Sequence, residues 1–202
     1  NLSKYGIKII SEEINNDTHI FENNVWIIDP LDGTLNLSIK YPCSSISIAL
    51  FKDMQPIIGV VQDLFYNTIY TSSLNGGSKK NNIQIQVSNT ENIKDAVLAT
   101  GFPSGGNYDT NYLTKFVQSV QNFKKVRAIG SASLMLSYVA EGVFDVYYEK
   151  DIYLWDVAAG IALVKEAGGE YYLNMSNDGF KCEVLASNKK IFLQAKKALI
   201  ND

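Results

Sequence analysis

The chain has 202 residues, of which 46% are hydrophobic and 19% charged, and its formal net charge is −3. This apolar content suffices for one domain with a sizeable core or for two small ones. The 18 Lys and Arg residues form no basic block, which argues against nucleic acid or an anionic membrane as the main partner. No apolar run approaches the roughly 20 residues of a membrane span, and we expect no signal peptide.

The first part of the chain alternates apolar and polar residues, which predicts strands. We expect a polar loop at 15–24, a loop or hairpin at 74–82, and strands at 6–10, 26–28, 44–51, 56–63 and 68–72. Together these segments predict a β-meander.

The second part adds segments with apolar residues at helical spacing, and several of these segments end at a glycine. We expect helices at 109–121, 131–141, 156–167 and 191–200, and strands at 96–100, 126–129, 143–148, 170–173 and 184–186. The pattern predicts an antiparallel α+β half, residues 1–90, joined to an α/β half, residues 91–202.

Two residue types limit the possible chemistry. Cys43 and Cys182 are a lone, distant pair, so two buried thiols in a reducing, cytoplasmic compartment are a better prediction than a disulfide, although the disulfide stays open. His19 is the only histidine and lies in a polar stretch. A Ser-His-Asp triad or a histidine zinc site is therefore not expected, and chemistry must depend mainly on carboxylates.

The stretch WIIDPLDGTLNL, residues 26–37, places two acids around a proline after an apolar run. Pro30 and Gly33 favour a sharp bend that brings Asp29 and Asp32 to one side. Two neighbouring carboxylates repel unless a cation shares them, and oxygen ligands without His or Cys suit Mg²⁺. Gly33 and Thr34 can open a short helix whose N–H groups face an anion. The alternative is an ordinary surface turn.

Acids from two further parts of the chain can reach the same place. Glu12 and Glu13 follow a predicted strand, although paired glutamates are also typical of a plain surface. Asp156 directly precedes a predicted helix, so it is a candidate N-cap, and a cap role is compatible with a metal role.

These residues carry a resemblance to the inositol monophosphatase family of Mg²⁺-dependent, lithium-sensitive phosphatases. WIIDPLDGTLN resembles the family's first signature, and LWDVAAGIALVKEAGG resembles its second. ISEE at 10–13 resembles the family's Gly-Glu-Glu element, with Ser11 in place of the usual glycine. TGFP at 100–103, RAIGSAS at 127–133 and VFDVYYE at 143–149 follow in family order.

The resemblance implies two or three Mg²⁺ ions as cofactors. Their expected ligands are the carboxylates of Glu12, Asp29, Asp32 and Asp156 and the backbone carbonyl of Leu31. The expected catalytic group consists of Glu12, Asp29, Asp32 and Thr34, with the threonine orienting the attacking water.

The resemblance also implies a substrate pocket. Gly33 and Thr34 would contact the phosphate through their N–H groups, and Glu149 would hold a substrate hydroxyl. The remaining expected substrate contacts are Gly130, Ser131, Ala132 and Asp156. Taken without the family, Glu149 is an ordinary acid at a strand end.

The implied fold is the layered αβαβα arrangement of sugar phosphatases, and the implied assembly is a homodimer. Family members carry two further helices before the Glu-Glu element, with an acid that helps to activate the water. We expect this first helical layer to be missing here, which would leave one sheet face as an apolar patch that needs a partner or a preceding segment to cover it.

The implied activity is metal-assisted hydrolysis of a small phosphate monoester, with inositol monophosphate or a related polyol or sugar phosphate expected. Leu35-Asn36-Leu37 after Thr34 differs from the sequence of the nucleotide-cleaving branch. Fructose-1,6-bisphosphatase, histidinol-phosphatase and 3′-phosphoadenosine phosphatase activities stay open. A non-catalytic protein that binds a protein or RNA partner is the alternative of another class.

Overall fold

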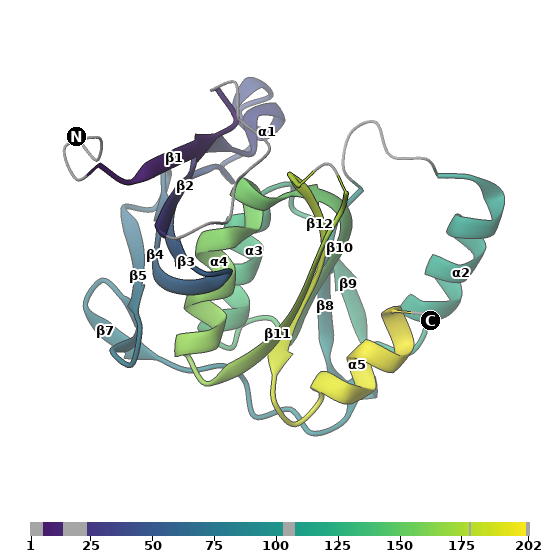
Figure 1. Cartoon of the computed structure of the whole chain (residues 1–202). Helices are drawn as coiled ribbons and strands as arrows, with labels where there is room; N and C mark the ends of the chain where they lie inside the picture. Colours follow the sequence, from purple (N-terminus) through teal and green to yellow (C-terminus); the bar gives the residue numbers. More distant parts are fainter. Residues whose placement is uncertain (1–5, 14–23, 103–107, 178, 201–202) are drawn as a thin grey trace.

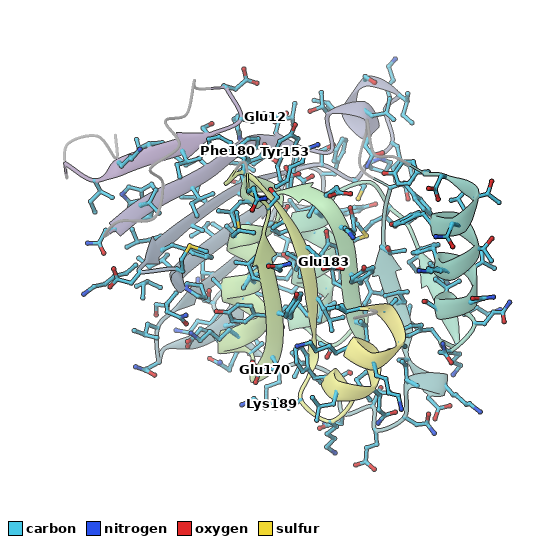
Figure 2. All side chains as sticks on the ribbon, turned by 45° about the vertical axis from the view of Figure 1, so that its right-hand side comes forward. Glu12, Tyr153, Glu170, Phe180, Glu183 and Lys189 are labelled. Atoms are coloured by element: carbon cyan, nitrogen blue, oxygen red, sulfur yellow. The ribbon has the colours of Figure 1, made fainter. Side chains whose placement is uncertain are left out.

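The computed structural model describes residues 6–13, 24–102, 108–177 and 179–200, arranged as two sheets with helices between and outside them (Figure 1). His19 and Pro103 lie outside these residues. The predicted loop at 15–24 also lies outside them, apart from Asn24. Figure 2 shows side chains filling the space between the two sheets.

The first sheet has seven strands that are neighbours in the order in which they occur in the sequence. Only the first pair, β1 and β2, is parallel, and the others are antiparallel. The predicted meander is therefore confirmed, and residues 77–85 form a hairpin. The strands are β1 (Lys8–Ser11), β2 (Asn24–Asp32), β3 (Ser45–Lys52), β4 (Gln55–Asp63), β5 (Thr68–Ser73), β6 (Gly77–Lys80) and β7 (Ile83–Ile85).

The second sheet has five strands in the order β11-β12-β10-β8-β9. Strands β10, β8 and β9 are parallel to one another, β12 is antiparallel to β10, and β11 is antiparallel to β12. Parallel strands need crossover connections, which α2 and α3 supply. The strands are β8 (Val97–Thr100), β9 (Lys125–Arg127), β10 (Val146–Tyr153), β11 (Gly169–Met175) and β12 (Lys181–Asn188).

The helices divide into buried and amphipathic ones. Helices α3 (Ala132–Ala140) and α4 (Leu154–Glu166) are buried nearly throughout and lie between the sheets. A side chain at Gly59 of β4 would place its Cβ 2.6 Å from the carbonyl oxygen of Ala159. That glycine therefore lets α4 lie directly against the first sheet.

The outer face of the second sheet is covered by α2 (Thr110–Val120) and α5 (Phe192–Leu199) (Figure 1). A separate apolar cluster forms there, including Leu98, Val146 and Leu185. The short helix α1 (Thr34–Ser38) and the 3₁₀ turn η2 (Ile93–Asp95) complete the described elements. The layers and the α+β class agree with the predicted fold, whereas the division at residues 90 and 91 stays a prediction.

One face of the first sheet packs on α4 and α3, and the other carries apolar side chains that are only partly buried. Trp26, Ile28, Ile48, Leu50 and Val60 alternate with fully buried neighbours along β2, β3 and β4. No helix among the described residues packs over this face. The identity of the group that covers it stays a prediction.

Cys43 and Cys182 are both free and buried, as expected for two thiols. Several element boundaries were predicted wrongly, including the start of β12, which is Lys181 and not residue 184. Strand β2 continues through Asp29 and Pro30 to Asp32, strand β10 extends to Tyr153, and helix α4 begins at Leu154. The continuation of β2 has a direct consequence for the site.

Candidate functional site

A cavity of about 310 Å³ opens where the first sheet meets the N-terminal ends of α3 and α4. All the residues expected in the site line it, and they come from five separate parts of the chain. They are Glu12, Asp29, Leu31, Asp32, Gly33, Thr34, Gly130, Ser131, Ala132, Glu149 and Asp156.

A bulge in β2 brings the two aspartates to the same side. Asp29 pairs with Ser47 and Asp32 with Ser45, so the register shifts between them. In a regular strand, residues three apart point to opposite faces. The bulge around Pro30 changes this alternation, and both carboxylates are buried. Pro30 is tolerated here because the ladder is already interrupted.

The two carboxylate oxygens of Asp29 have different surroundings. Its Oδ1 accepts a hydrogen bond from the backbone N–H of Leu31 at 2.8 Å. Its Oδ2 is buried and makes no hydrogen bond among the described residues, while the Asp156 carboxyl group lies close enough to share a proton with Asp29. Burial, together with the charge of nearby Asp32, raises the pKa of Asp29 to about 7. A buried carboxylate oxygen left in this way needs a cation or a proton.

Asp32 is anchored by the start of helix α3. Its Oδ2 accepts from the Ser131 hydroxyl at 2.7 Å, the Ser133 N–H at 2.8 Å and the Ser133 hydroxyl at 2.7 Å. Burial raises the pKa of Asp32, and these hydrogen bonds oppose the rise. The serines therefore fix the orientation of this carboxylate.

Asp156 lies in the first turn of α4, not at its N-cap. The cap residue is Tyr153, which makes no side-chain cap bond, so the predicted cap role of Asp156 is wrong. Burial and the charges of Asp32, Asp29 and Glu12 raise the pKa of Asp156 to about 9. Glu12 follows strand β1, and its pKa is raised by partial burial and by Glu13 and Asp32.

The donor set fits a hard divalent cation. It consists of carboxylates whose charges oppose one another, one carboxylate oxygen without a partner, and no His or Cys ligand among the described residues. Mg²⁺ prefers such oxygen ligands. Within the described residues, however, no three acidic, His or Cys side chains stand in a geometry that can hold a metal ion.

The turn after β2 is built around Gly33. This residue has φ 83°, and a Cβ there would lie 2.8 Å from the carbonyl oxygen of Cys43. Only glycine meets both conditions without strain. The Thr34 hydroxyl donates to the carbonyl oxygen of Leu31 at 3.0 Å. The short helix α1 that was expected to follow is present.

Glu149 forms the opposite wall of the cavity. It lies within strand β10, not at its end, and is 5% exposed. Burial raises its pKa to about 8, and the neighbouring hydroxyl of Tyr147 opposes that rise. A Cβ at Gly101 would lie 2.6 Å from Oε1 of Glu149. The carboxyl group therefore fits closely between β8 and β10.

Sequence reasoning missed three residues that shape the site. Ser133 binds Asp32. Asn36 donates to the carbonyl oxygens of Cys43 at 2.8 Å and Ile129 at 2.7 Å, which ties α1 to the segment before α3. Phe102 lines the cavity beside Gly101. All three lie in the sequence motifs that carry the family resemblance, but their roles depend on partners that are distant in sequence.

The fold and the cavity define a layered α+β protein with an acidic, oxygen-donor site. The chain belongs to the inositol monophosphatase family, whose family model matches residues 3–201. No helix among the residues described is long and apolar enough to span a membrane.

Several curated relatives resemble the chain. It is 35% identical to a fructose-1,6-bisphosphatase/inositol-1-monophosphatase of Aquifex aeolicus over 82% of the chain and 63% of that protein. It is 36% identical to an inositol-1-monophosphatase of Synechocystis over 95% of the chain and 68% of that protein. A Nus factor SuhB of Xylella fastidiosa is 34% identical over 88% of the chain and 68% of that protein.

The chain spans between 54% and 63% of the length of the first three curated relatives it matches. Among solved structures, the inositol monophosphatase of Anabaena superposes with a TM-score of 0.86 at 33% identity. That match covers 98% of this chain and 80% of the Anabaena chain.

Proposed function

We propose that this chain forms the active site of a metal-dependent phosphatase that hydrolyses a small phosphate monoester. The observation that carries the proposal is Oδ2 of Asp29, a buried carboxylate oxygen without a donor, beside Asp32 and Asp156. The proposed metal ligands are Glu12, Asp29, Asp32, Asp156 and the carbonyl oxygen of Leu31, and the proposed metal is Mg²⁺ in two or three copies.

Bound Mg²⁺ would supply Lewis-acid chemistry to the phosphate and lower the pKa of a water. The residues supply orientation. The Thr34 hydroxyl donates its hydrogen to Leu31, so its lone pairs are available to accept a hydrogen from the attacking water. Asp32 keeps its position through Ser131 and Ser133. Without a cation, burial favours the protonated forms of these carboxyl groups. The ionised forms would be favoured instead once Mg²⁺ binds.

The proposed substrates are inositol monophosphate and related polyol or sugar phosphates. Glu149 faces the cavity and can hydrogen-bond a hydroxyl. Gly33, Thr34, Gly130, Ser131 and Ala132 line the same cavity and are the proposed phosphate and ring contacts. The names of the Aquifex and Synechocystis relatives support this substrate class.

A second candidate is a non-catalytic role in binding a protein or RNA partner. It is favoured by relatives named Nus factor SuhB. The acids Glu12, Asp29, Asp32 and Asp156 around one cavity favour catalysis instead. A homodimer, inhibition by lithium and a cytoplasmic location are further proposals that rest on the family alone.

The test is phosphate release with and without Mg²⁺, using the 202-residue chain and the longest natural form that contains it. The substrates are myo-inositol 1-phosphate, fructose 1,6-bisphosphate, histidinol phosphate and 3′-phosphoadenosine 5′-phosphate. We expect Mg²⁺-dependent release that is fastest with the inositol ester. If neither form releases phosphate from any substrate, the catalytic proposal is wrong.

A further inference from the structure

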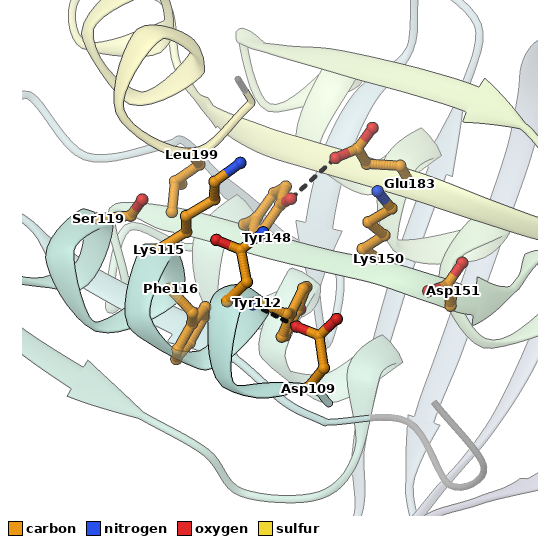
Figure 3. A pocket seen from close by; sticks show the side chains of 11 residues that line it. Asp109, Tyr112, Lys115, Phe116, Ser119, Tyr148, Lys150, Asp151, Glu183 and Leu199 are labelled. Carbon is orange, nitrogen blue, oxygen red and sulfur yellow. Dashed lines mark hydrogen bonds between the residues drawn. The ribbon is translucent and has the colours of Figure 1, made fainter. Parts of the chain in front are cut away.

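A second cavity, of about 350 Å³, lies on the opposite face of strand β10 from the catalytic cavity (Figure 3). Successive residues of a strand point to opposite faces. Glu149 lines the catalytic cavity, and its neighbours Tyr148 and Lys150 line the second one. Helix α2, strand β12 and the end of α5 complete its wall. This size lies at the lower end for small-ligand sites, about 300–1,000 Å³, and suits a ligand with a single ring.

The wall of this second cavity is partly apolar. Tyr112 and Phe116 of α2, Tyr148 of β10 and Leu199 at the end of α5 all line it (Figure 3). Tyr148 is buried, and its hydroxyl donates to Glu183 at 2.8 Å, which fixes the ring. Aromatic rings supply apolar area against which an apolar group of a ligand can pack.

Charges of both signs surround these rings. Lys115 of α2 and Lys150 of β10 lie on either side of Tyr148 in Figure 3. The two ion pairs among the described residues are elsewhere, Lys80–Glu141 and Lys190–Glu91, so neither ammonium group is paired within the described part of the chain. The acids that line the cavity are Asp109, Asp151 and Glu183.

This mixture of charges restricts the ligand. A simple anion would meet the three carboxylates, and a simple cation would meet the two ammonium groups. A molecule with one carboxylate, one ammonium group and an apolar side chain can match all three parts of the wall. We propose that this cavity binds a small zwitterion with an aromatic or branched apolar side chain, of the α-amino acid class.

The position of the cavity connects it physically to the catalytic one. Phe102 lines the catalytic cavity, and its ring packs edge-to-face on Phe116 with centroids 4.9 Å apart. A ligand against Phe116 would therefore restrict Phe102. This regulatory part rests on the proposed phosphatase function, and it predicts a changed KM for the phosphate ester when the second cavity is filled.

The binding test uses isothermal titration with EDTA present, so it does not depend on catalysis. L-Phenylalanine is compared with 3-phenylpropanoate, which lacks the ammonium group, and 2-phenylethylamine, which lacks the carboxylate. We expect the amino acid to bind at least about 10-fold more tightly than either analogue. Equal binding of an analogue would overturn the zwitterion class. If phenylalanine, tyrosine and leucine all fail to bind at about 10 mM, the site itself is overturned.

Variants locate the binding. Lys115→Gln and Lys150→Gln should each weaken phenylalanine binding by about 10-fold, whereas Lys52→Gln, an exposed lysine on strand β3, should not change it. Asp29→Asn should also bind phenylalanine normally. If the two cavity variants bind like the parent chain, or if Asp29→Asn removes binding, the proposed location is wrong. Far-UV circular dichroism confirms that each variant is folded.

Phosphate-release assays test the regulatory part separately. Phenylalanine should change the KM of the parent chain and leave that of Lys115→Gln unchanged at the same concentration. Binding with no effect on the parent's KM would retain the site and overturn its link to the catalytic cavity. If the chain releases no phosphate at all, the proposed function fails while the titration result still stands.

Discussion

The buried carboxylate of Asp32 is held by Ser133, which lies 101 residues further along the chain and donates both its N–H and its hydroxyl to Oδ2. The first residue ends strand β2 of the seven-stranded sheet, and the second is in the first turn of α3. The acidic cavity therefore depends on the docking of α3 against the first sheet.

Ser133→Ala should reduce Mg²⁺-dependent turnover by about 10-fold, because loss of an outer hydrogen bond to a metal ligand typically lowers metal affinity or activity by 10–100-fold. Mg²⁺ titrations of the phosphate-release rate measure this effect. The matched control is Ser137→Ala, since that hydroxyl is buried in the same helix but donates to the carbonyl oxygen of Ser133. Equal losses in the two variants would show that Ser133 is only structural.

Glu149→Gln should impair hydrolysis of polyol phosphates more than that of a simple aryl phosphate, which lacks the hydroxyls. Gly101→Ala should have the same selective effect, because its Cβ would displace the Glu149 carboxyl group. The measurement is kcat/KM for both substrates. A uniform loss would mean that Glu149 supports the wall without contacting the substrate.

Asn36→Ala should lower stability by about 2 kcal/mol, because it leaves one buried and one partly buried carbonyl oxygen without their donor. It should also weaken turnover, since α1 would lose its tie to the segment before α3. Urea unfolding gives the first quantity and phosphate release the second. Asn122→Ala is the control, because its amide bonds are exposed at the end of α2. A stability equal to that of the control would contradict a stabilising link by Asn36 between α1 and the segment before α3.

Without metal, the chain should become less stable as pH rises. The pKa values of Asp29, Glu149 and Asp156 are raised by burial to about 7, 8 and 9, whereas unfolded acids titrate near 4. Between these values the folded chain binds more protons than the unfolded chain. The stability that these three acids contribute is therefore fully present below about pH 4. It is lost as pH rises to about 9.

Thermal unfolding with EDTA across this pH range measures the effect. The Asp29→Asn/Asp156→Asn chain should show a flatter profile, and Mg²⁺ should stabilise the parent chain more at high pH than at low pH. A parent profile that rises toward pH 9 in EDTA, relative to the double variant, would contradict the assigned direction.

The fold could be predicted largely from local patterns. Alternation in β3 and β4 and the glycine after α4 locate their elements to within a few residues. The exceptions were positions where tertiary contacts decide the outcome. A proline normally ends a central strand, yet β2 continues through Pro30 because the ladder bulges there.

The site was less predictable than its motifs suggest. Asp29 and Asp32 could be identified from their spacing and their signature. The bonds from Ser133 and Asn36 could not, because each joins groups about a hundred residues apart or reaches a backbone carbonyl that no side-chain pattern reveals. The second cavity likewise combines α2, β10 and β12, which are separate in sequence.

The most direct test of the proposed function is Mg²⁺-dependent phosphate release by Asp29→Asn beside the parent chain, with myo-inositol 1-phosphate as substrate. Replacing the buried, unpartnered oxygen by an amide should reduce kcat/KM by about 100-fold or more at saturating Mg²⁺. Circular dichroism should show an unchanged fold. Turnover near the parent value would contradict a metal site built on Asp29.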